Sequence, residues 1–137
     1  MKIVLDTNCL LPAIFPRSMY HWVWTSFRQG SFTICYSNEI IEEYEEMLSR
    51  LYPPEMTENT IQLLLTAHNV EKVISYYKWN FINVDPDDNK FADCYLNANA
   101  DFIVTNDKHF NILKEIDFPP MKVIDIDTFK QMISPLK

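Results

Sequence analysis

Hydrophobic residues occur along the chain in short continuous runs that alternate with longer stretches of helical spacing. The short runs predict strands at 2–5, 31–36, 81–84, 102–104 and 122–125. The longer stretches predict helical structure to residue 29 and then helices over 38–51, 55–78, 87–99, 107–113 and 127–133. Strands and helices in this order are typical of a parallel β-sheet sandwiched by helices. We therefore predict an α/β fold with about five parallel strands, in a single domain over residues 1–137.

The composition narrows the classes of function. Gly30 is the only glycine among 137 residues, so the chain contains no glycine-rich dinucleotide turn, no Walker A loop and no G-x-S-x-G nucleophile elbow. The net charge of −7 argues against a broad basic face for a nucleic-acid backbone. It is compatible with an enzyme whose acidic residues hold cations that in turn contact phosphates.

The cysteines and the apolar runs indicate the compartment. Cys9, Cys35 and Cys94 form no C-x-x-C pair, and we expect reduced thiols in the core of a cytosolic protein. No apolar run approaches the roughly 18 residues that span a bilayer. Asp6 and Asn8 interrupt the first apolar stretch, which we interpret as part of the fold rather than as a signal peptide. These features predict a cytoplasmic protein without a membrane segment.

Acidic residues follow three of the predicted strands. Asp6 follows the first strand, Asp107 follows the fourth, and the third leads into Asp85, Asp87 and Asp88. Each could simply cap a helix, because Asp favours helix N-termini. Capping does not require every strand end to be acidic, however, and ligands of open parallel sheets bind beyond the carboxyl ends of the strands. We therefore predict a cleft lined by carboxylates at this edge.

Helix phase separates the acids of the helix over 87–99. Asp88 points with Phe91, Ala92 and Tyr95 toward the core, whereas Asp93 points nearly opposite and is expected to be a solvated charge. A carboxylate on a buried face costs free energy unless it meets a donor or a metal. Asp88 is therefore a candidate ligand.

The helix over 38–51 carries five glutamates around one apolar stripe. The stripe consists of Ile40, Ile41, Tyr44, Met47, Leu48 and Leu51. The glutamates that face away from it are Glu39, Glu42 and Glu46. Glu43 and Glu45 flank the stripe on opposite sides, and the helical wheel does not choose between them.

Converging carboxylates repel one another unless a cation lies among them. Oxygen ligands without Cys or His favour Mg²⁺ or Mn²⁺ over zinc. The histidines His21, His68 and His109 lack H-E-x-x-H spacing, and only His109 lies near a candidate acid, Asp107. The chemistry predicted for the cleft is therefore that of a hard divalent cation.

Four segments of the chain resemble the PIN-domain family of metal-dependent ribonucleases. They are IVLDTN at 3–8, SNEIIEEYEEML at 37–48, DPDDNKFAD at 85–93 and IVTNDKHF at 103–110. Each segment is short, but their order and spacing together make the resemblance specific. The chain is similar over nearly its whole length to the toxin-like, VapC-type members of toxin–antitoxin pairs.

The resemblance implies a site and an activity. Its catalytic and metal-binding acids correspond to Asp6, Glu43, Asp88 and Asp107, which chooses Glu43 over Glu45. It implies that Asn8 and Thr105 or Asn106 orient ligands or water. It also implies an endoribonuclease that uses Mg²⁺ or Mn²⁺, RNA as substrate and an antitoxin as partner.

Possible contacts with such partners are spread over the chain. The candidate contacts to an RNA backbone are Arg17, Arg28, Lys90 and Lys108, each of which is also an ordinary surface charge in the simpler interpretation. The aromatic group is Tyr20, Trp22, Trp24 and Phe27, and it combines core packing with a surface for a partner or a second copy in a homodimer. An antitoxin would cover that surface or plug the acidic cleft.

Two alternatives remain open from the sequence. The first is a PIN-like binding module that keeps the fold without catalytic turnover. The second is a metal-dependent phosphatase with Asp6 as nucleophile, although such haloacid-dehalogenase-like enzymes use a D-x-D pair and the chain has Asn8 at the second position. A metal-dependent assay on RNA and on a small phosphomonoester separates the enzymes.

Overall fold

The central feature of the fold is one sheet of five parallel strands. The structure, a computed structural model, describes residues 1–74, 89–115 and 120–133. The strands are β1 (Lys2–Leu5), β2 (Thr33–Tyr36), β3 (Val70–Lys72), β4 (Phe102–Val104) and β5 (Val123–Ile124). Their order across the sheet is β3-β2-β1-β4-β5. The predicted α/β fold with a five-stranded parallel sheet is thus confirmed, and β1 lies at its centre.

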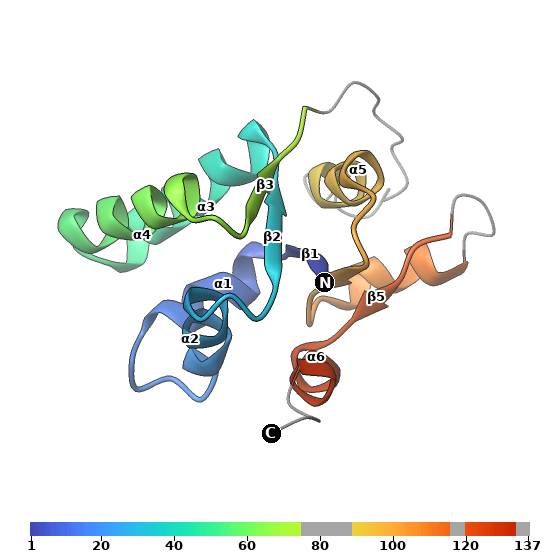
Figure 1. Cartoon of the computed structure of the whole chain (residues 1–137), viewed down its shortest axis with the longest axis horizontal. Helices are drawn as coiled ribbons and strands as arrows, with labels where there is room; N and C mark the ends of the chain where they lie inside the picture. The colour runs from blue at the N-terminus through green and yellow to red at the C-terminus, as the bar shows by residue number, and fades with distance from the viewer. Residues whose placement is uncertain (75–88, 116–119, 134–137) are drawn as a thin grey trace.

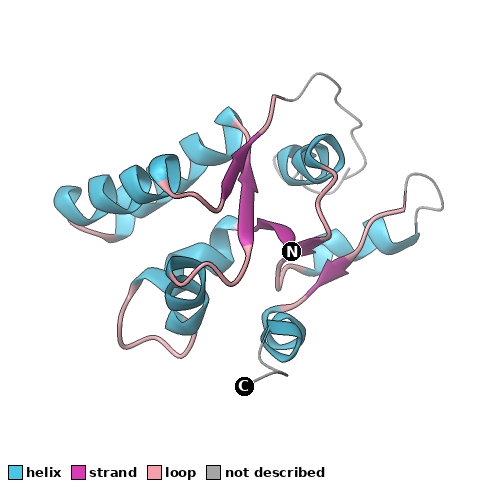
Figure 2. Cartoon of the chain, viewed as in Figure 1, coloured by secondary structure: helices cyan, strands magenta, loops and turns pink. Residues whose placement is uncertain are grey.

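Helices cover both faces of this sheet. They are α1 (Thr7–Ile14), α2 (His21–Arg28), α3 (Asn38–Leu51), α4 (Pro54–Thr66), α5 (Asn89–Ala98), the 3₁₀ helix η2 (Lys108–Glu115) and α6 (Ile126–Ile133). Helices α1 to α4 lie on one side of the strands and α5 lies on the other (Figures 1 and 2). Because both faces are covered, the central strands are apolar without alternation, as in Ile3, Val4 and Leu5.

Helix α3 follows the sequence pattern to the residue. The Ser37 hydroxyl accepts a hydrogen bond from the Ile40 N–H and so caps the first turn. The proline pair after Tyr52 ends the helix, since proline cannot donate the next backbone bond. The predicted core stripe is buried at Ile40, Tyr44 and Leu48. Its last member is an error, because Leu51 is 61% exposed at the end of the helix.

The largest error concerns the third strand. A helix was expected over 55–78, but α4 ends at Thr66 and β3 follows at Val70–Lys72. This strand is only three residues long, lies at the edge of the sheet and is mostly polar. An edge strand buries little, so it lacks the apolar run by which the other strands were recognised. The strand expected at 81–84 lies outside the described residues.

Asp93 was also placed wrongly, because it is 5% exposed rather than solvated. Helix α5 packs against β1, β2 and β4 and also touches α3, so more than one stripe of it is enclosed. Asn89 and Cys94 are buried on the same helix. A helical wheel with one buried face therefore does not describe α5.

The aromatic group after α1 packs mostly into the core. Trp24 and Phe27 are buried, and Trp22 is half-buried with its ring centroid 5.9 Å from that of Phe129 on α6. The large apolar side chains that remain exposed in this region are Phe15 and Met19, in the connection from α1 to α2. The large exposed apolar side chains of this region therefore belong to the connection rather than to the tryptophans.

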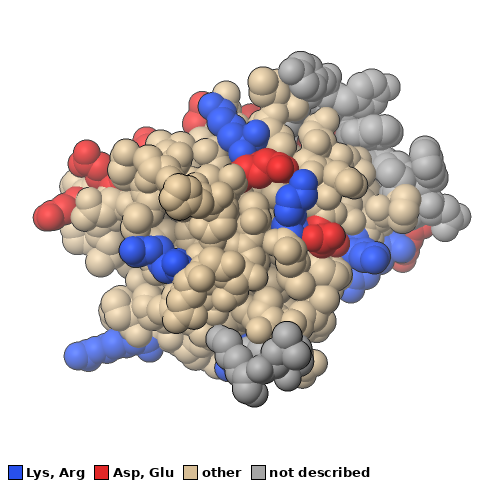
Figure 3. All heavy atoms as spheres, in the orientation of Figure 1, with Lys and Arg blue, Asp and Glu red and all other residues tan. Residues whose placement is uncertain are grey.

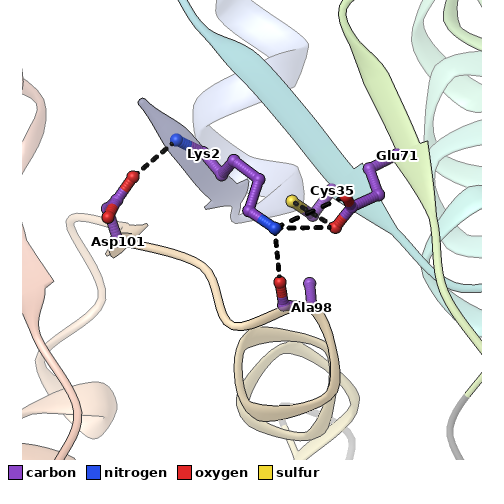
Figure 4. Close-up of polar contacts among 5 residues, drawn as sticks. All are labelled: Lys2, Cys35, Glu71, Ala98 and Asp101. Carbon is purple, nitrogen blue, oxygen red and sulfur yellow. Dashed lines mark hydrogen bonds and ion pairs between the residues drawn. The ribbon is translucent and has the colours of Figure 1, made fainter.

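The amino edge of the sheet is tied together by Lys2. Its ammonium lies 3.1 Å from the Glu71 carboxylate and donates to the carbonyl of Ala98 at the end of α5. Its backbone N–H donates to the carboxylate of Asp101, and Cys35 lies beside Glu71 (Figure 4). This network links strands from both halves of the sheet to α5.

The cysteines are core residues, as expected. Cys9, Cys35 and Cys94 are free thiols, all buried. Charged side chains are mixed over the face in Figure 3, where lysines and arginines form no continuous basic patch. In the described part of the chain, every helix is too short or too polar to cross a membrane.

Candidate functional site

The predicted site lies where the strand order reverses. The chain moves from β1 through β2 to β3 on one side, and β4 returns to the other side of β1. Leu5 and Val104 are paired at the ends of these two strands, and the N–H of Asp6 donates to the carbonyl of Val104. Such a reversal point is the usual ligand site of an open parallel sheet. Asp6 therefore stands at the position where a ligand is expected.

Asp6 is held in the interior without capping α1. Its residue is 3% exposed and occupies the N-cap position, but its side chain makes no capping hydrogen bond. Instead one carboxylate oxygen, Oδ2, accepts a hydrogen bond of 2.8 Å from the Thr105 hydroxyl. The capping interpretation thus fails for Asp6, whose side chain faces the end of β4.

The electrostatic environment of Asp6 opposes its ionisation. The pKa of its carboxyl is raised to about 6, chiefly by burial and further by the charges of Asp107 and Glu43, while the Thr105 hydrogen bond acts in the opposite direction. The charges of two predicted acids, Asp107 and Glu43, therefore act on a third, Asp6. The Asp6 carboxyl is poised to take up a proton just below neutral pH.

Glu43 reaches this region from α3. One of its carboxylate oxygens accepts a hydrogen bond from the hydroxyl of Thr7, the residue after Asp6. Its other oxygen lies 2.9 Å from the ammonium of Lys90 on α5, in a pair whose side chains are 26% and 14% exposed. Glu45 is exposed and lines a separate groove between α3 and α4. The geometry thus directs Glu43, and not Glu45, toward the end of β1.

Tyr44 positions Glu43 by attaching α3 to the carboxyl end of β1. Its side chain is fully buried, and its hydroxyl donates to the carbonyl of Leu5, the residue before Asp6. Burial raises the pKa of the Tyr44 phenol well above its ordinary value, so it stays a neutral donor. Because Tyr44 and Glu43 are consecutive, this contact ties the carboxylate of α3 to the end of β1.

Asp107 is half-buried after β4. Its N–H donates to the Thr105 hydroxyl over 2.9 Å, and its Oδ1 accepts from the N–H of His109. The ring of His109 also lies 3.5 Å from that oxygen. Asp107 therefore caps the start of η2, and its charge also acts on Asp6. The sequence had left open whether this acid caps a helix or belongs to the site, and in the structure it does both.

The remaining predicted residues are distributed unevenly. Asn8 is exposed on the first turn of α1, and the side chain of Asn106 accepts from the N–H of Ile126 at the start of α6. Asp88 lies outside the described residues, as do Asp85 and Asp87. Among the residues that the structure describes, Thr105 is the predicted orienting residue whose side chain contacts an acid of the site.

The donor set fits a hard cation in chemistry but is incomplete in the described part of the chain. The donors near β1 and β4 are carboxylates and hydroxyls, which suit Mg²⁺ or Mn²⁺. Among the residues described, no three His, Cys, Asp or Glu side chains are gathered closely enough to hold a metal ion. The remaining predicted acid, Asp88, lies outside these described residues.

Two residues of the site were not predicted for their roles. Lys90 was considered only as a surface charge or a contact to RNA, yet it is mostly buried and paired with Glu43. Thr7 links Glu43 to the segment of Asp6. The signal for Lys90 was its place between Asn89 and Phe91, on a helix whose burial extends around more than one face.

Comparisons with known proteins agree with this architecture. The sequence profile of the PIN domain matches residues 2–109. The chain is similar to the crystal structure of VapBC2 from Rickettsia felis bound to a DNA fragment from its promoter, with 18% identity and a TM-score of 0.61, over 91% of this chain and 98% of that one. It is also similar to FitAcB from Neisseria gonorrhoeae, with 14% identity and a TM-score of 0.54, over 89% and 96% of the two chains. The curated proteins searched contain no match.

The chain therefore belongs to the PIN domain family. The resemblance carried by the four sequence segments is confirmed, and the solved structures share the fold at low identity. PIN domains are generally nucleases, and this membership supports a nuclease activity.

Proposed function

We propose that the protein is a divalent-metal-dependent endoribonuclease whose reactive carboxylates are Asp6, Glu43, Asp88 and Asp107. The observation that carries the proposal is the buried Asp6 carboxylate at the reversal point of the sheet, with the charges of Glu43 and Asp107 acting on it. A structural role alone gives no reason to gather like charges there, because their repulsion costs stability. Family membership supports the same conclusion.

The four carboxylates would hold Mg²⁺ or Mn²⁺. Such an ion, when bound, lowers the pKa of a coordinated water and stabilises negative charge that develops on a phosphate. The hydroxyls of Thr7 and Thr105 orient Glu43 and Asp6 for this task by their hydrogen bonds.

The residues themselves supply proton binding and orientation. In the metal-free protein burial and the charges of Asp107 and Glu43 raise the pKa of Asp6 to about 6, so its carboxyl readily holds a proton that a bound cation would displace. The Thr105 hydroxyl holds one carboxylate oxygen of Asp6 in place. Lys90 places a positive charge at Glu43, beside the edge that a phosphodiester would approach.

One observation favours the non-catalytic alternative. The Lys90 ammonium already neutralises Glu43, so the site has a cation of its own. A PIN-like binding module would need no more than this. Catalytic turnover therefore has to be measured directly.

We further propose that the protein is the toxin of a toxin–antitoxin pair acting in the cytosol. The VapBC2 and FitAcB structures of similar fold are complexes of this kind. A groove of about 440 Å³ between α1, α2 and α4 is lined by apolar side chains such as Ile14, Trp24, Met56 and Leu63, and Phe15 and Met19 are exposed in the connection from α1 to α2. An antitoxin would cover this apolar region.

The deciding experiment is cleavage of single-stranded RNA and of a small phosphomonoester, each with Mg²⁺ or Mn²⁺ and with EDTA. Metal-dependent cleavage of RNA alone supports the ribonuclease. Hydrolysis of the phosphomonoester instead supports the phosphatase alternative. A folded protein that binds a partner but cleaves nothing supports the binding module.

A further inference from the structure

A polar pocket opens beyond the ends of β4 and β5, next to the candidate site. Its volume is about 660 Å³. Its walls come from the connection after β4, from η2, from β5 and from the start of α6. The residues that matter below include Thr105, Asp107, Lys108, Asn111, Lys114 and Asp125. This size lies within the range of about 300–1,000 Å³ that is usual for small-ligand sites.

The spacing of η2 builds one wall of the pocket. A 3₁₀ helix has three residues per turn, so residues three apart lie on the same face. Lys108, Asn111 and Lys114 form this repeat and line the pocket, while Phe110 and Leu113 are buried on another face. The wall therefore presents an amide between two ammonium groups.

Both lysines can bind a ligand, although the charge of Lys114 also acts on Asp125 across the pocket and helps to lower the pKa of that carboxyl. Each is exposed, and neither forms an ion pair with any residue that the structure describes. Asn111 is exposed between them and can both donate and accept hydrogen bonds. Two cations and an amide on one face suit an anionic ligand that also carries a hydrogen-bonding edge.

The opposite wall is acidic and fixed in place. The Asp125 carboxylate accepts a hydrogen bond of 2.7 Å from the N–H of Thr128, and hydrogen bonding by Thr128, first through its side chain and then through this N–H, lowers the pKa of Asp125. Asp127 lies in the first turn of α6. A phosphate is repelled by this wall and attracted by η2, whereas a hydroxyl or amino group can donate to the carboxylates. The pocket is thus polarised from one wall to the other.

The pocket is continuous with the candidate site through two residues. Thr105 and Asp107 line it, and the hydroxyl of Thr105 is bonded to Asp6. We propose that this pocket binds one nucleotide of a single-stranded RNA beside the bond to be cleaved, with its two flanking phosphates on Lys108 and Lys114 and its base on Asn111. This inference rests on the proposed function, since it places the substrate of the same site.

The test measures RNA binding rather than cleavage. A fluorescein-labelled single-stranded RNA is titrated in EDTA at several salt concentrations with the wild type, with the double variant Lys108→Ala/Lys114→Ala and with Asn111→Ala. Loss of two phosphate contacts should raise Kd about tenfold at low salt and reduce the slope of log K against log salt by about 1.4, at about 0.7 per contact on single strands. Asn111→Ala should weaken binding severalfold with an unchanged slope.

The matched control is Lys72→Ala/Lys122→Ala. It removes the same charge from two exposed lysines that do not line the pocket, one of them on the far edge strand β3. Its Kd and slope should stay close to those of the wild type. Thermal melts should be unchanged in all these variants, because the substituted side chains are exposed.

The outcomes separate this inference from the ribonuclease proposal. RNA cleavage by the wild type, together with equal Kd and slope in the Lys108→Ala/Lys114→Ala variant and the wild type, overturns the pocket alone. Lysine-dependent RNA binding without cleavage in Mn²⁺ supports the pocket and overturns the ribonuclease. A wild type that does not bind RNA, or a control that loses as much as the double variant, also overturns the pocket.

Discussion

Thr105 and Asp6 lie 99 positions apart in the sequence and are joined by a hydrogen bond of 2.8 Å between the Thr105 hydroxyl and the Asp6 carboxylate. The same hydroxyl accepts the N–H of Asp107. One small side chain therefore connects the acid after β1 to the acid after β4. The bond also favours the charged form of Asp6 against the burial that opposes it.

Thr105→Val should therefore change the titration of Asp6. The substitution keeps the shape but removes the hydroxyl, so the pKa of Asp6 should rise further. We expect a loss of about 1–2 kcal/mol in the free energy of unfolding at neutral pH, because a buried acceptor is left without its donor. Urea unfolding measures this loss, and Thr105→Ser, which keeps the hydroxyl, should retain most of the stability. Equal behaviour of the Val and Ser variants would show that the bond is unimportant.

Asp6→Asn should remove a pH dependence of stability. The pKa of Asp6 is about 6 in the folded protein against an ordinary 3.8, so the metal-free folded state binds a proton more readily than the unfolded chain. Its contribution to stability is complete below pH 3.8 and is lost as pH rises through 6, by about 3 kcal/mol at about 1.4 kcal/mol per pKa unit.

The measurement is urea unfolding in EDTA from about pH 4 to about pH 7.5, the range over which this proton is released. The wild type should lose stability across it, and Asp6→Asn should not. The exposed Glu42→Gln serves as the charge control and should follow the wild type. A mutant that is clearly less stable than the wild type at the upper pH would make Asp6 a structural acceptor.

Three glutamates of α3 should differ in activity. Glu43→Gln should abolish RNA cleavage, since Glu43 faces Thr7 and Lys90. Glu46→Gln should not affect it, because Glu46 is exposed and pairs with Arg50 on its own helix. Glu45→Gln should likewise be active, since Glu45 lines the groove toward α4. Cleavage rates under one condition decide this, and equal losses in the three variants would contradict the assignment.

Metal removal should abolish cleavage and change stability. We expect EDTA to stop RNA hydrolysis and Mg²⁺ or Mn²⁺ to restore it. A cation bound only by the folded state stabilises it, so thermal melts of the wild type should shift upward with metal, and those of Asp6→Asn should shift less. Cleavage that continues in excess EDTA would refute the metal-dependent mechanism.

The three cysteines should be unreactive in the native protein. Burial raises the pKa of Cys9 to about 12 and that of Cys35 to about 11, and it also raises the pKa of Cys94. The thiolate is the reactive form, so a thiol reagent at neutral pH should label the cysteines only after denaturant is added. Rapid labelling of the folded protein would show that the core opens easily.

The sequence predicts best those elements whose ends and core faces are both marked. Helix α3 has a capping serine, a following proline pair and a clear apolar stripe, and its bounds were predicted without error. Strand β3 has none of these marks, because backbone pairing with β2 rather than burial of its own side chains holds it in place. Its position therefore depends on the neighbouring strand β2, and the local sequence of β3 does not reveal it.

The site shows the same division. Asp6 and Asp107 could be predicted from their position after apolar strands, whereas the pairing of Lys90 with Glu43 depends on how α5 packs against α3. The helical wheel left Glu43 and Glu45 equivalent, and in space the contacts of Glu43 with Thr7 and Lys90 distinguish them. The role of the four acids stays a prediction, and Asp88 lies outside the described residues.

The central position of β1 has a consequence for biosynthesis. This strand is made first, but its neighbour β4 begins at Phe102, and Thr105 follows still later. Contacts between segments so distant in sequence form only after a large loop has closed. A growing chain on the ribosome therefore carries Asp6 unpaired through most of its synthesis. No nascent product that stops before residue 102 can assemble the carboxylates, so the site stays latent until β4 and the residues after it have been made.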